Sequence, residues 1–181
     1  MRYENLPKMT NWFGCYAVDI PWGHLERHLE RELEDGKLDI DPDFQRAHVW
    51  DLTKQTRFVE FVLRGGTSAQ NLMLNCPNYQ RGNREGPYVL VDGKQRLESV
   101  MRFLRDDIVI FGRHRRSDFT DHMPLHCRFR WHVNELKTRR EVLQWYIDMN
   151  EGGVAHTSEE ISKVNGLLAK EIERATHPAN R

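Results

Sequence analysis

The sequence has few cysteines, no long apolar run and no net charge. Its three cysteines stand far apart in 181 residues, which excludes the disulfide framework of a small secreted domain and favours a reducing compartment. No apolar run approaches the roughly 18 residues that a membrane helix needs, and residues 1–5 lack the apolar core of a signal peptide. These absences predict a cytoplasmic protein with no membrane partner.

An excess of one charge sign is also absent, because 27 basic residues balance 27 acidic ones. This balance excludes a strongly basic coat for nucleic acid, although it allows one basic face. Residues 19–60 carry 11 acidic and 6 basic side chains, a net charge of −5. Residues 102–140 carry 10 basic and 5 acidic side chains, a net charge of +5. The second segment is therefore the candidate for contact with a polyanion.

Apolar periodicity predicts a mixed α/β fold in a single domain over residues 1–175, with an irregular arm at 1–18, C-terminal helices at 138–175 and a frayed tail at 176–181. Strands are predicted at 15–18, 38–40, 71–75, 88–91, 108–111 and 127–133. The run at 88–91 is nearly all apolar, which is typical of a central strand. Helices are predicted at 21–36, 51–65 and 97–104, and after the capping boxes Thr138/Glu141 and Thr157/Glu160.

The strongest local signal is the pentapeptide Asp-Gly-Lys-Gln-Arg at residues 92–96, between a predicted buried strand and a helix. Backbone N–H groups at a helix start have no partner inside the helix and attract anions. Gly93 allows a ligand to approach the backbone, and Lys94 and Arg96 add charges suited to phosphate. Asp92 is placed to hold a divalent metal or to accept a proton. The alternative is a turn with solvated charges, in which Asp92 only caps the helix.

Two further polar clusters lie at the ends of predicted elements, where binding sites gather. The first covers residues 41–50, and the second covers residues 150–153. Taken alone, the first is a loop with a proline turn and a core tryptophan. The second is the end of a helix followed by a turn. Without the pentapeptide, neither cluster indicates what kind of ligand or reaction the site would serve.

In this order and spacing, the three clusters resemble a known family. The residues that carry the resemblance are Asp43 to Arg46 with Val49 and Trp50, then Val91 to Leu97, then Ile147 to Gly153. They are similar to the N-terminal domain of GmrSD-type modification-dependent restriction proteins, within the ParB/sulfiredoxin-like superfamily. The resemblance covers roughly residues 38–165 and departs from the family's Asp-Gly-Gln-Gln-Arg motif at Lys94.

The resemblance implies a small mixed sheet of ParB/sulfiredoxin-like type, flanked by helices. It further implies binding of ATP or GTP with Mg²⁺, NTP hydrolysis or phosphoryl transfer, and a link to DNA. The residues implied in catalysis are Asp92, which is also the metal ligand, Lys94 and Arg96. The residues implied in nucleotide binding are Asp43, Gln45, Arg46, Trp50, Gly93, Gln95 and Asn150.

The departure at Lys94 favours a kinase-like transfer over plain hydrolysis, because phosphoryl transfer depends mostly on positioning and charge neutralisation. A hydroxyl on modified DNA is a suitable acceptor. GmrSD-type proteins usually carry a second, His-Asn-His nuclease domain, for which the residues after 165 are too few. We therefore expect a standalone module, of a size that suits a phage or mobile-element gene, acting in the host cytoplasm.

Three functions compete at this level. The leading hypothesis is an NTP-dependent phosphotransfer enzyme or NTP hydrolase that acts on DNA or is gated by it. The alternative is a non-catalytic nucleotide- or DNA-binding regulator, or a decoy of host restriction. A metal-dependent nuclease is the third hypothesis, and it is weaker because no clustered carboxylate set stands out. Nucleotide turnover separates the first from the second, and strand cleavage without nucleotide favours the third. The sequence leaves the oligomeric state open.

A DNA contact is predicted on the basic segment. Alternation along the predicted strand 127–133 puts Arg128 and Arg130 on one face and Phe129 on the other. A ridge of arginines follows a phosphate backbone well, whereas the alternative is a solubilising loop and sheet edge. The predicted DNA-binding residues are Arg113, Arg115, Arg116, Arg128 and Arg130.

Four histidines and one cysteine also fall in this segment, within 19 positions. Structural zinc sites usually have a close pair of ligands on each side, and this spacing does not match that pattern. We prefer solvated histidines in contact with nucleic acid, and the sequence leaves zinc binding by the five residues open. They are His114, His122, His126, Cys127 and His132.

Overall fold

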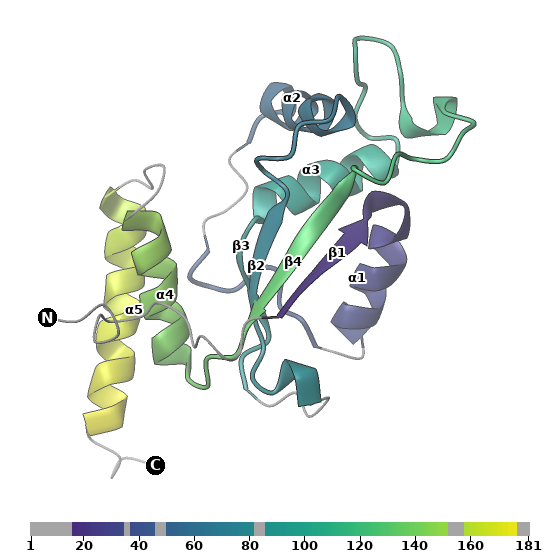
Figure 1. The fold of residues 1–181 in the computed structure, drawn as a ribbon. Helices are drawn as coiled ribbons and strands as arrows, with labels where there is room; N and C mark the ends of the chain where they lie inside the picture. The colour runs from purple at the N-terminus through teal and green to yellow at the C-terminus, as the bar shows by residue number, and fades with distance from the viewer. Residues whose placement is uncertain (1–15, 35–36, 46–49, 82–85, 152–157, 177–181) are drawn as a thin grey trace, which may run out of the picture.

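The computed structural model describes residues 16–34, 37–45, 50–81, 86–151 and 158–176 (Figure 1). Four strands form one sheet in the order β1-β4-β2-β3, and their bounds are Tyr16–Pro21 (β1), Asn71–Asn75 (β2), Val89–Asp92 (β3) and Arg128–Asn134 (β4). β1 runs antiparallel to β4 and β3 antiparallel to β2, whereas β4 and β2 are parallel. The sheet is therefore mixed, which confirms the predicted α/β class.

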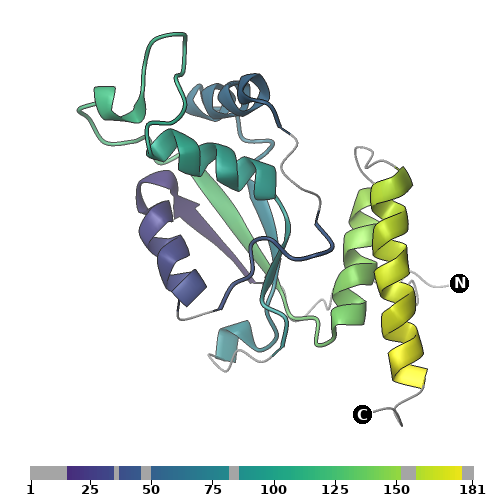
Figure 2. The ribbon, with the colours of Figure 1, turned by 180° about the vertical axis from the view of Figure 1, so that it is seen from behind.

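Five α-helices accompany the sheet: α1 (Leu25–Glu34), α2 (Leu52–Leu63), α3 (Lys94–Leu104), α4 (Arg139–Glu151) and α5 (Ser158–Thr176). Short 3-10 turns occur at Trp22–His24, Tyr79–Arg81 and Arg116–Asp118. α3 crosses in front of the sheet in Figure 2, and α1 lies beside it. α4 and α5 pack together beside β3. In the described part of the chain, no helix is both long and apolar enough to span a bilayer.

Two apolar clusters share β3. The larger one joins the sheet to α1, α2 and α3 and includes Leu90. The smaller one joins α4 and α5 to Val89, Val91 and Phe44. Because side chains alternate along a strand, β3 faces one cluster with one side and the second cluster with the other. The C-terminal helices are thus attached to the body through β3.

The position of β3 differs from the prediction of a central strand. β3 lies at the end of the four-strand order, and its all-apolar sequence reflects burial on both faces. Its outer edge is paired at Asp39, whose N–H donates to the Tyr88 carbonyl at 2.9 Å and whose carbonyl accepts from Leu90 N–H at 2.8 Å. This single bridge is all that the described structure forms of the strand predicted at 38–40.

Other predictions were wrong in detail. Residues 108–111 form a turn rather than a strand, with a single bridge between Ile110 and His114. Pro21 ends β1 and is also the N-cap of the 3-10 turn at Trp22–His24, which runs directly into α1, so the helix predicted from residue 21 begins with a 3-10 turn. Leu33 is 38% exposed, so it leaves the buried stripe of α1. In its place Glu32 is buried and accepts a hydrogen bond from the Tyr88 hydroxyl at 2.7 Å.

Helix starts follow the predicted capping chemistry where they are described. The Asp51 carboxylate accepts from the Lys54 N–H at 2.7 Å and caps α2. Ahead of α4, the Thr138 N–H donates to Glu141 Oε2 at 2.9 Å, and the Glu141 N–H donates back to Thr138 Oγ1 at 3.2 Å. This reciprocal pair is the predicted capping box. The box predicted at Thr157 lies outside the described residues.

Asn75 at the end of β2 joins three segments in the interior. Its side chain is fully buried, and its Nδ2 donates to the carbonyls of Pro87 at 3.0 Å and Leu136 at 2.9 Å. Its Oδ1 accepts from the Leu136 N–H at 2.8 Å. One amide therefore satisfies backbone groups ahead of β3 and ahead of α4.

We predict that Asn75→Ala lowers the free energy of unfolding by about 2–4 kcal/mol, because buried backbone groups lose their partners. Asn71→Ala provides the matched control, since Asn71 begins the same strand with an exposed side chain. That control should stay within about 0.5 kcal/mol of the wild type in chemical denaturation. Equal stability of the two variants would contradict a structural role for the Asn75 amide.

Candidate functional site

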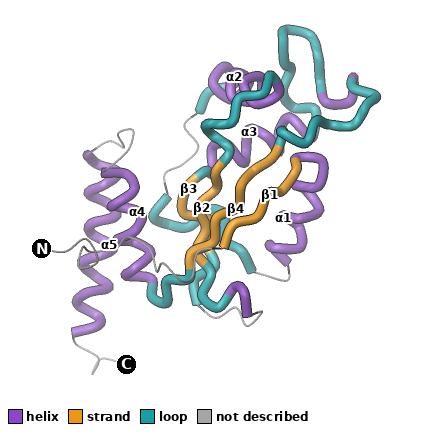
Figure 3. The backbone as a smooth tube through the Cα atoms, in the orientation of Figure 1, coloured by secondary structure: helices purple, strands orange, loops and turns teal. Residues whose placement is uncertain are grey.

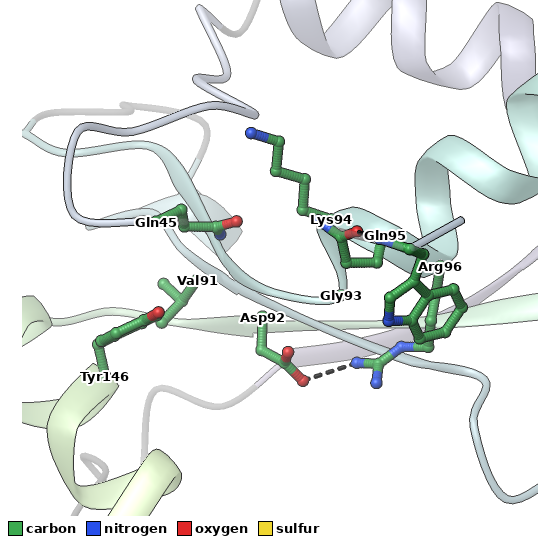
Figure 4. Close-up of a pocket in the computed structure, with 9 residues that line it drawn as sticks. Gln45, Val91, Asp92, Gly93, Lys94, Gln95, Arg96 and Tyr146 are labelled. Atoms are coloured by element: carbon green, nitrogen blue, oxygen red, sulfur yellow. Dashed lines mark hydrogen bonds and ion pairs between the residues drawn. The ribbon is translucent and has the colours of Figure 1, made fainter. Parts of the chain in front are cut away.

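A polar cleft lies where β3 meets α3, between the two apolar clusters. It holds about 450 Å³ of empty space, part of it open to solvent (Figure 4). The residues that line it are Gln45, Trp50, Val91, Asp92, Gly93, Lys94, Gln95, Arg96 and Tyr146. The fold thus brings the pentapeptide at 92–96 together with two residues of the 41–50 cluster.

Gly93 makes the tight turn between β3 and α3. Its φ of +108° lies in the left-handed region, where side chains are disfavoured. A Cβ at this position would overlap the Leu72 Cδ2 methyl group of β2 and would stand 3.4 Å from the Asn71 carbonyl oxygen. Both backbone angle and space therefore require glycine. The consequence is that β2 closely approaches the first turn of α3.

Asp92 and Arg96 form an ion pair across this turn. Arg96 Nη2 lies 2.6 Å from Asp92 Oδ2 and donates to the Asn71 carbonyl at 2.9 Å. The Asp92 side chain is 54% exposed, and its Oδ1 has no hydrogen-bond partner among the described residues. Asp92 does not cap α3, because the N-cap is Gly93 and no side chain bonds to the cap amides. Its carboxylate instead faces the cleft.

The remaining polar side chains of the cleft are also engaged. Lys94 Nζ pairs with the Asp41 carboxylate, and the Gln45 amide donates to the Leu90 carbonyl. Gln95 Oε1 accepts from the Trp50 N–H at 3.0 Å. These contacts fix the 41–50 cluster against β3 and α3. They also show that both cations of the cleft already have a carboxylate partner.

Two residues expected in the site lie outside the cleft wall. Asp43 receives both of its oxygen contacts from Arg139 Nη2, at 2.7 and 2.8 Å. Asn150 donates to the Tyr146 carbonyl at 2.6 Å within α4. Asp43 thus joins the 41–45 segment to α4, whereas the Asn150 contact stays within α4, and neither residue lines the cleft. Arg46 lies outside the described residues.

Tyr146 is a cleft residue that sequence reasoning assigned only to the core of a helix. It points from α4 toward β3, and its ring packs against Phe44 at 5.3 Å between centroids. The only feature of the sequence that pointed to the cleft was the tyrosine hydroxyl group, because a position buried among apolar side chains does not need one. Tyr146 reaches the cleft because α4 packs on β3, and apolar periodicity alone does not predict that packing.

Comparison with known proteins identifies the family. The model of the GmrSD restriction endonuclease N-terminal domain matches residues 29–166. The chain belongs to this family. No curated protein and no solved structure matches it. The match runs from α1 into α5 and contains every residue that lines the cleft.

The donor set of this GmrSD-type cleft restricts which metal it can hold. Among the described residues, no group of three His, Cys, Asp or Glu side chains is placed to bind a metal ion. Asp92 is the one carboxylate among the residues that line the cleft. Mg²⁺ is often held by one or two carboxylates together with the phosphates of a substrate. The cleft therefore fits a magnesium–nucleotide complex better than a metal held by protein alone.

The arginines predicted to contact DNA fall on two separate parts of the domain. Arg128 and Arg130 lie on β4 opposite Asp19 of β1, at 3.2 and 2.9 Å from its carboxylate. The hydrogen bond from Arg130 lowers the pKa of Asp19 below its usual value. On the other face of β4, Phe129 and Trp131 are fully buried, as the alternation predicted. Asp19 partly neutralises this pair of arginines.

The other three arginines lie in the loop of residues 105–127, which projects beyond α2 and α3 (Figure 3). Arg113 donates to His114 at 3.0 Å, and Arg116 donates to the Phe119 carbonyl at 3.3 Å. Arg115 donates to the Asp106 carbonyl. None of the three guanidinium groups makes an ion pair with a described carboxylate. The loop itself has no net charge, because its four arginines are matched by four aspartates, so any basic surface on it depends on where these side chains lie.

The histidines and cysteine of the basic segment do not gather. His126 Nε2 contacts the Leu63 carbonyl at 3.3 Å, and His114 packs on Phe119. Burial lowers the pKa of His132 and raises the pKa of the Cys127 thiol to about 11. Cys76 is likewise a buried free thiol. The Cys127 thiol is therefore protonated at neutral pH and is a poor nucleophile.

We predict that Gly93→Ala destabilises the domain by more than about 3 kcal/mol, because steric overlap with Leu72 adds to the unfavourable φ. Gly65→Ala is the matched control. Gly65 has a φ of +94°, but a Cβ there would meet nothing within 4 Å. The control should cost about 1–2 kcal/mol in thermal or chemical denaturation. Similar losses for both variants would show that the close approach of β2 is unimportant.

Proposed function

We propose that this domain binds a nucleoside triphosphate with Mg²⁺ in the cleft and transfers or hydrolyses its terminal phosphoryl group in a reaction linked to DNA. The observation that supports this most directly is the start of α3. There a left-handed glycine, an unpaired set of helix N–H groups, a lysine, an arginine and an aspartate all face one cleft. Membership of a restriction-protein family gives the DNA context.

The phosphates would lie over the first turn of α3. The turn at Gly93 leaves the backbone open, and the helix dipole favours negative charge at this end. Lys94 would exchange Asp41 for a phosphate oxygen. The Asp41 side chain is 73% exposed, so it can turn into solvent when a phosphate oxygen takes its place at Lys94.

Asp92 and Arg96 would act on the transferred group. Arg96 lines the cleft, where its Nη2 is held by the Asn71 carbonyl and by Asp92, and a guanidinium group suits a phosphate. The free Oδ1 of Asp92 would hold Mg²⁺ or accept the proton of the attacking hydroxyl group. Mg²⁺ supplies charge neutralisation on the phosphate oxygens when it is bound.

The base would lie against the aromatic side chains of the cleft. Trp50 lines the cleft, and its ring is oriented by Phe58 at 5.6 Å and by Lys54 Nζ at 4.9 Å. Tyr146 closes the opposite wall from α4. Stacking on such rings tolerates any base, so this arrangement supports nucleotide binding without preference for ATP or GTP.

A non-catalytic nucleotide sensor is the second candidate. It is supported by the charge balance of the cleft, where both Lys94 and Arg96 already pair with carboxylates. Such a protein would bind nucleotide and leave it intact. Incubation with γ-labelled ATP or GTP, with and without modified and unmodified DNA, separates the two functions by where the label goes. Label on inorganic phosphate or DNA supports catalysis, and intact nucleotide supports the sensor.

We predict that Asp92→Asn lowers turnover by roughly 10²–10⁴-fold and spares the fold, since the carboxylate faces the cleft and does not cap α3. Asp107→Asn is the matched control, because it makes the same change on an exposed residue beyond the other end of α3. Both variants should melt close to the wild type. Near-normal turnover in Asp92→Asn would remove its catalytic role.

Arg96→Ala should raise KM at least as much as it lowers kcat, because its guanidinium would contact phosphate in the ground state as well as in the transition state. Calorimetry with ATP–Mg²⁺ and GTP–Mg²⁺ checks the binding directly. If the wild type binds neither, with or without DNA, the cleft is not a nucleotide site. An Arg96→Ala variant with unchanged affinity would place the phosphates elsewhere.

We predict that the double charge reversal Arg113→Glu with Arg116→Glu weakens DNA binding for all sequences alike and reduces the slope of log K against log salt by roughly 2. The control reverses Arg27 and Lys163, which are exposed on α1 and α5. The net charge of the protein changes equally in both variants, so a difference in their DNA affinity or salt slope shows a local contact with DNA. Equal salt slopes in filter binding or anisotropy would show that the loop is a solvated surface.

A further inference from the structure

A second hollow lies at the far end of α3 from the cleft. It is formed by the ends of α2 and α3 and by the 105–127 loop, and it holds about 770 Å³ of empty space, part of it open to solvent. Its floor is the buried ring of Phe103. Two further rings, Phe111 and Phe119, line it from the loop and are 46% and 40% exposed. The hollow is therefore aromatic and accessible.

Charged groups without ion pairs surround these rings. Arg64 and Arg116 line the hollow, and neither makes an ion pair among the described residues. Asp121 lines it as well, and its exposed carboxylate has no described partner. A ligand that satisfies all three must carry an anionic group, a hydrogen-bond donor and a flat apolar surface.

The backbone holds Phe111 in place in an unfavourable conformation. Its φ of +48° is in the left-handed region, which is costly for a residue with a side chain. The conformation is maintained by Glu60 of α2, whose Oε1 accepts from the Phe111 N–H at 2.6 Å. Because the ring gains little burial in return, its position is better explained by contact with a ligand than by stability.

We propose that this hollow binds one unstacked nucleobase of DNA. The base would stack against Phe111 and Phe119, its exocyclic amino group would donate to Asp121, and its flanking phosphates would lie at Arg64 and Arg116. Charge complementarity decides this occupant, since an apolar peptide would leave the two guanidinium groups unpaired. The inference rests on the proposed DNA contact and gives that contact a base-reading site.

Cytosine, adenine and guanine carry an exocyclic amino group, whereas thymine carries none. The hollow therefore predicts a preference for oligo(dC) and oligo(dA) over oligo(dT). The test measures fluorescence anisotropy of labelled single-stranded 12-mers of each type with the full chain. Wild type should bind dC and dA more tightly than dT. Asp121→Ala should bring the three affinities together.

Phe119→Ala should weaken binding of the dC and dA oligonucleotides by about 5- to 100-fold, the usual effect of losing one stacking ring. Leu125→Ala is the matched control, because Leu125 is 78% exposed on the same loop and does not line the hollow. Both substituted side chains are exposed, so thermal melts of the two variants should match the wild type. Equal oligonucleotide affinity of Phe119→Ala and Leu125→Ala would overturn the proposal.

Other results would also overturn it. These are absence of oligonucleotide binding by the wild type, equal affinity for all three oligonucleotides, or a loss of self-association in Phe119→Ala at unchanged oligonucleotide affinity. Calorimetry with ATP–Mg²⁺ on the same variants distinguishes oligonucleotide binding in this hollow from nucleotide binding in the cleft. Phe119→Ala should retain wild-type nucleotide affinity. If oligonucleotide binding depends on Phe119 and no nucleotide binds, the proposal for this hollow is supported and the proposed nucleotide site in the cleft is rejected.

Discussion

The close approach of β2 to the first turn of α3 is the contact on which the geometry of the cleft depends. Leu72 fills the space beside Gly93, so the backbone can turn only through a left-handed glycine. The same approach brings the Asn71 carbonyl within 2.9 Å of the Arg96 guanidinium, which in turn holds Asp92 at 2.6 Å. A side chain at position 93 would separate β2 from α3. The orientation of both charged residues would then be lost together with the packing.

The second requirement is that two apolar clusters meet at β3. The sheet with α1, α2 and α3 forms one cluster, and α4 and α5 form the other. A cleft results where the clusters diverge beyond the end of β3, and each contributes one wall. The contacts of Arg139 with Asp43 and of Phe44 with Tyr146 hold the second wall in place. Asp43, Phe44 and Arg139 do not line the cleft, but through these contacts they help to determine its width.

Local chemistry made part of this structure predictable from the sequence. The pentapeptide at 92–96, the Asp51 cap and the strand at 71–75 are encoded by neighbouring residues, and each appears where it was expected. The edge position of β3 and the pairing of Asp19 with Arg128 and Arg130 depend on residues distant in the sequence. The all-apolar sequence of β3 indicates burial on both faces of the sheet. It does not indicate whether β3 has a neighbouring strand on each side, as a central strand has. Tyr146 was missed for the same reason. Helical periodicity identifies the buried face of α4, but it does not identify the element against which that face packs.

The charge balance of the cleft bears on which anions the proposed site would accept. Lys94 is paired with Asp41 and Arg96 with Asp92, so the empty cleft offers no unpaired cation among its lining residues. A small monovalent anion would replace one exposed carboxylate by another group of equal charge, and it would gain little. A triphosphate differs because several of its oxygens reach Lys94, Arg96 and the helix N–H groups at once. Asp92 would hold Mg²⁺, which supplies positive charge beside the phosphates, so the one carboxylate of the cleft would be a ligand rather than a repulsive group. On this argument the paired cations are a source of selectivity for a metal-bound polyphosphate, and the loss of either carboxylate would make the cleft bind simple anions more readily.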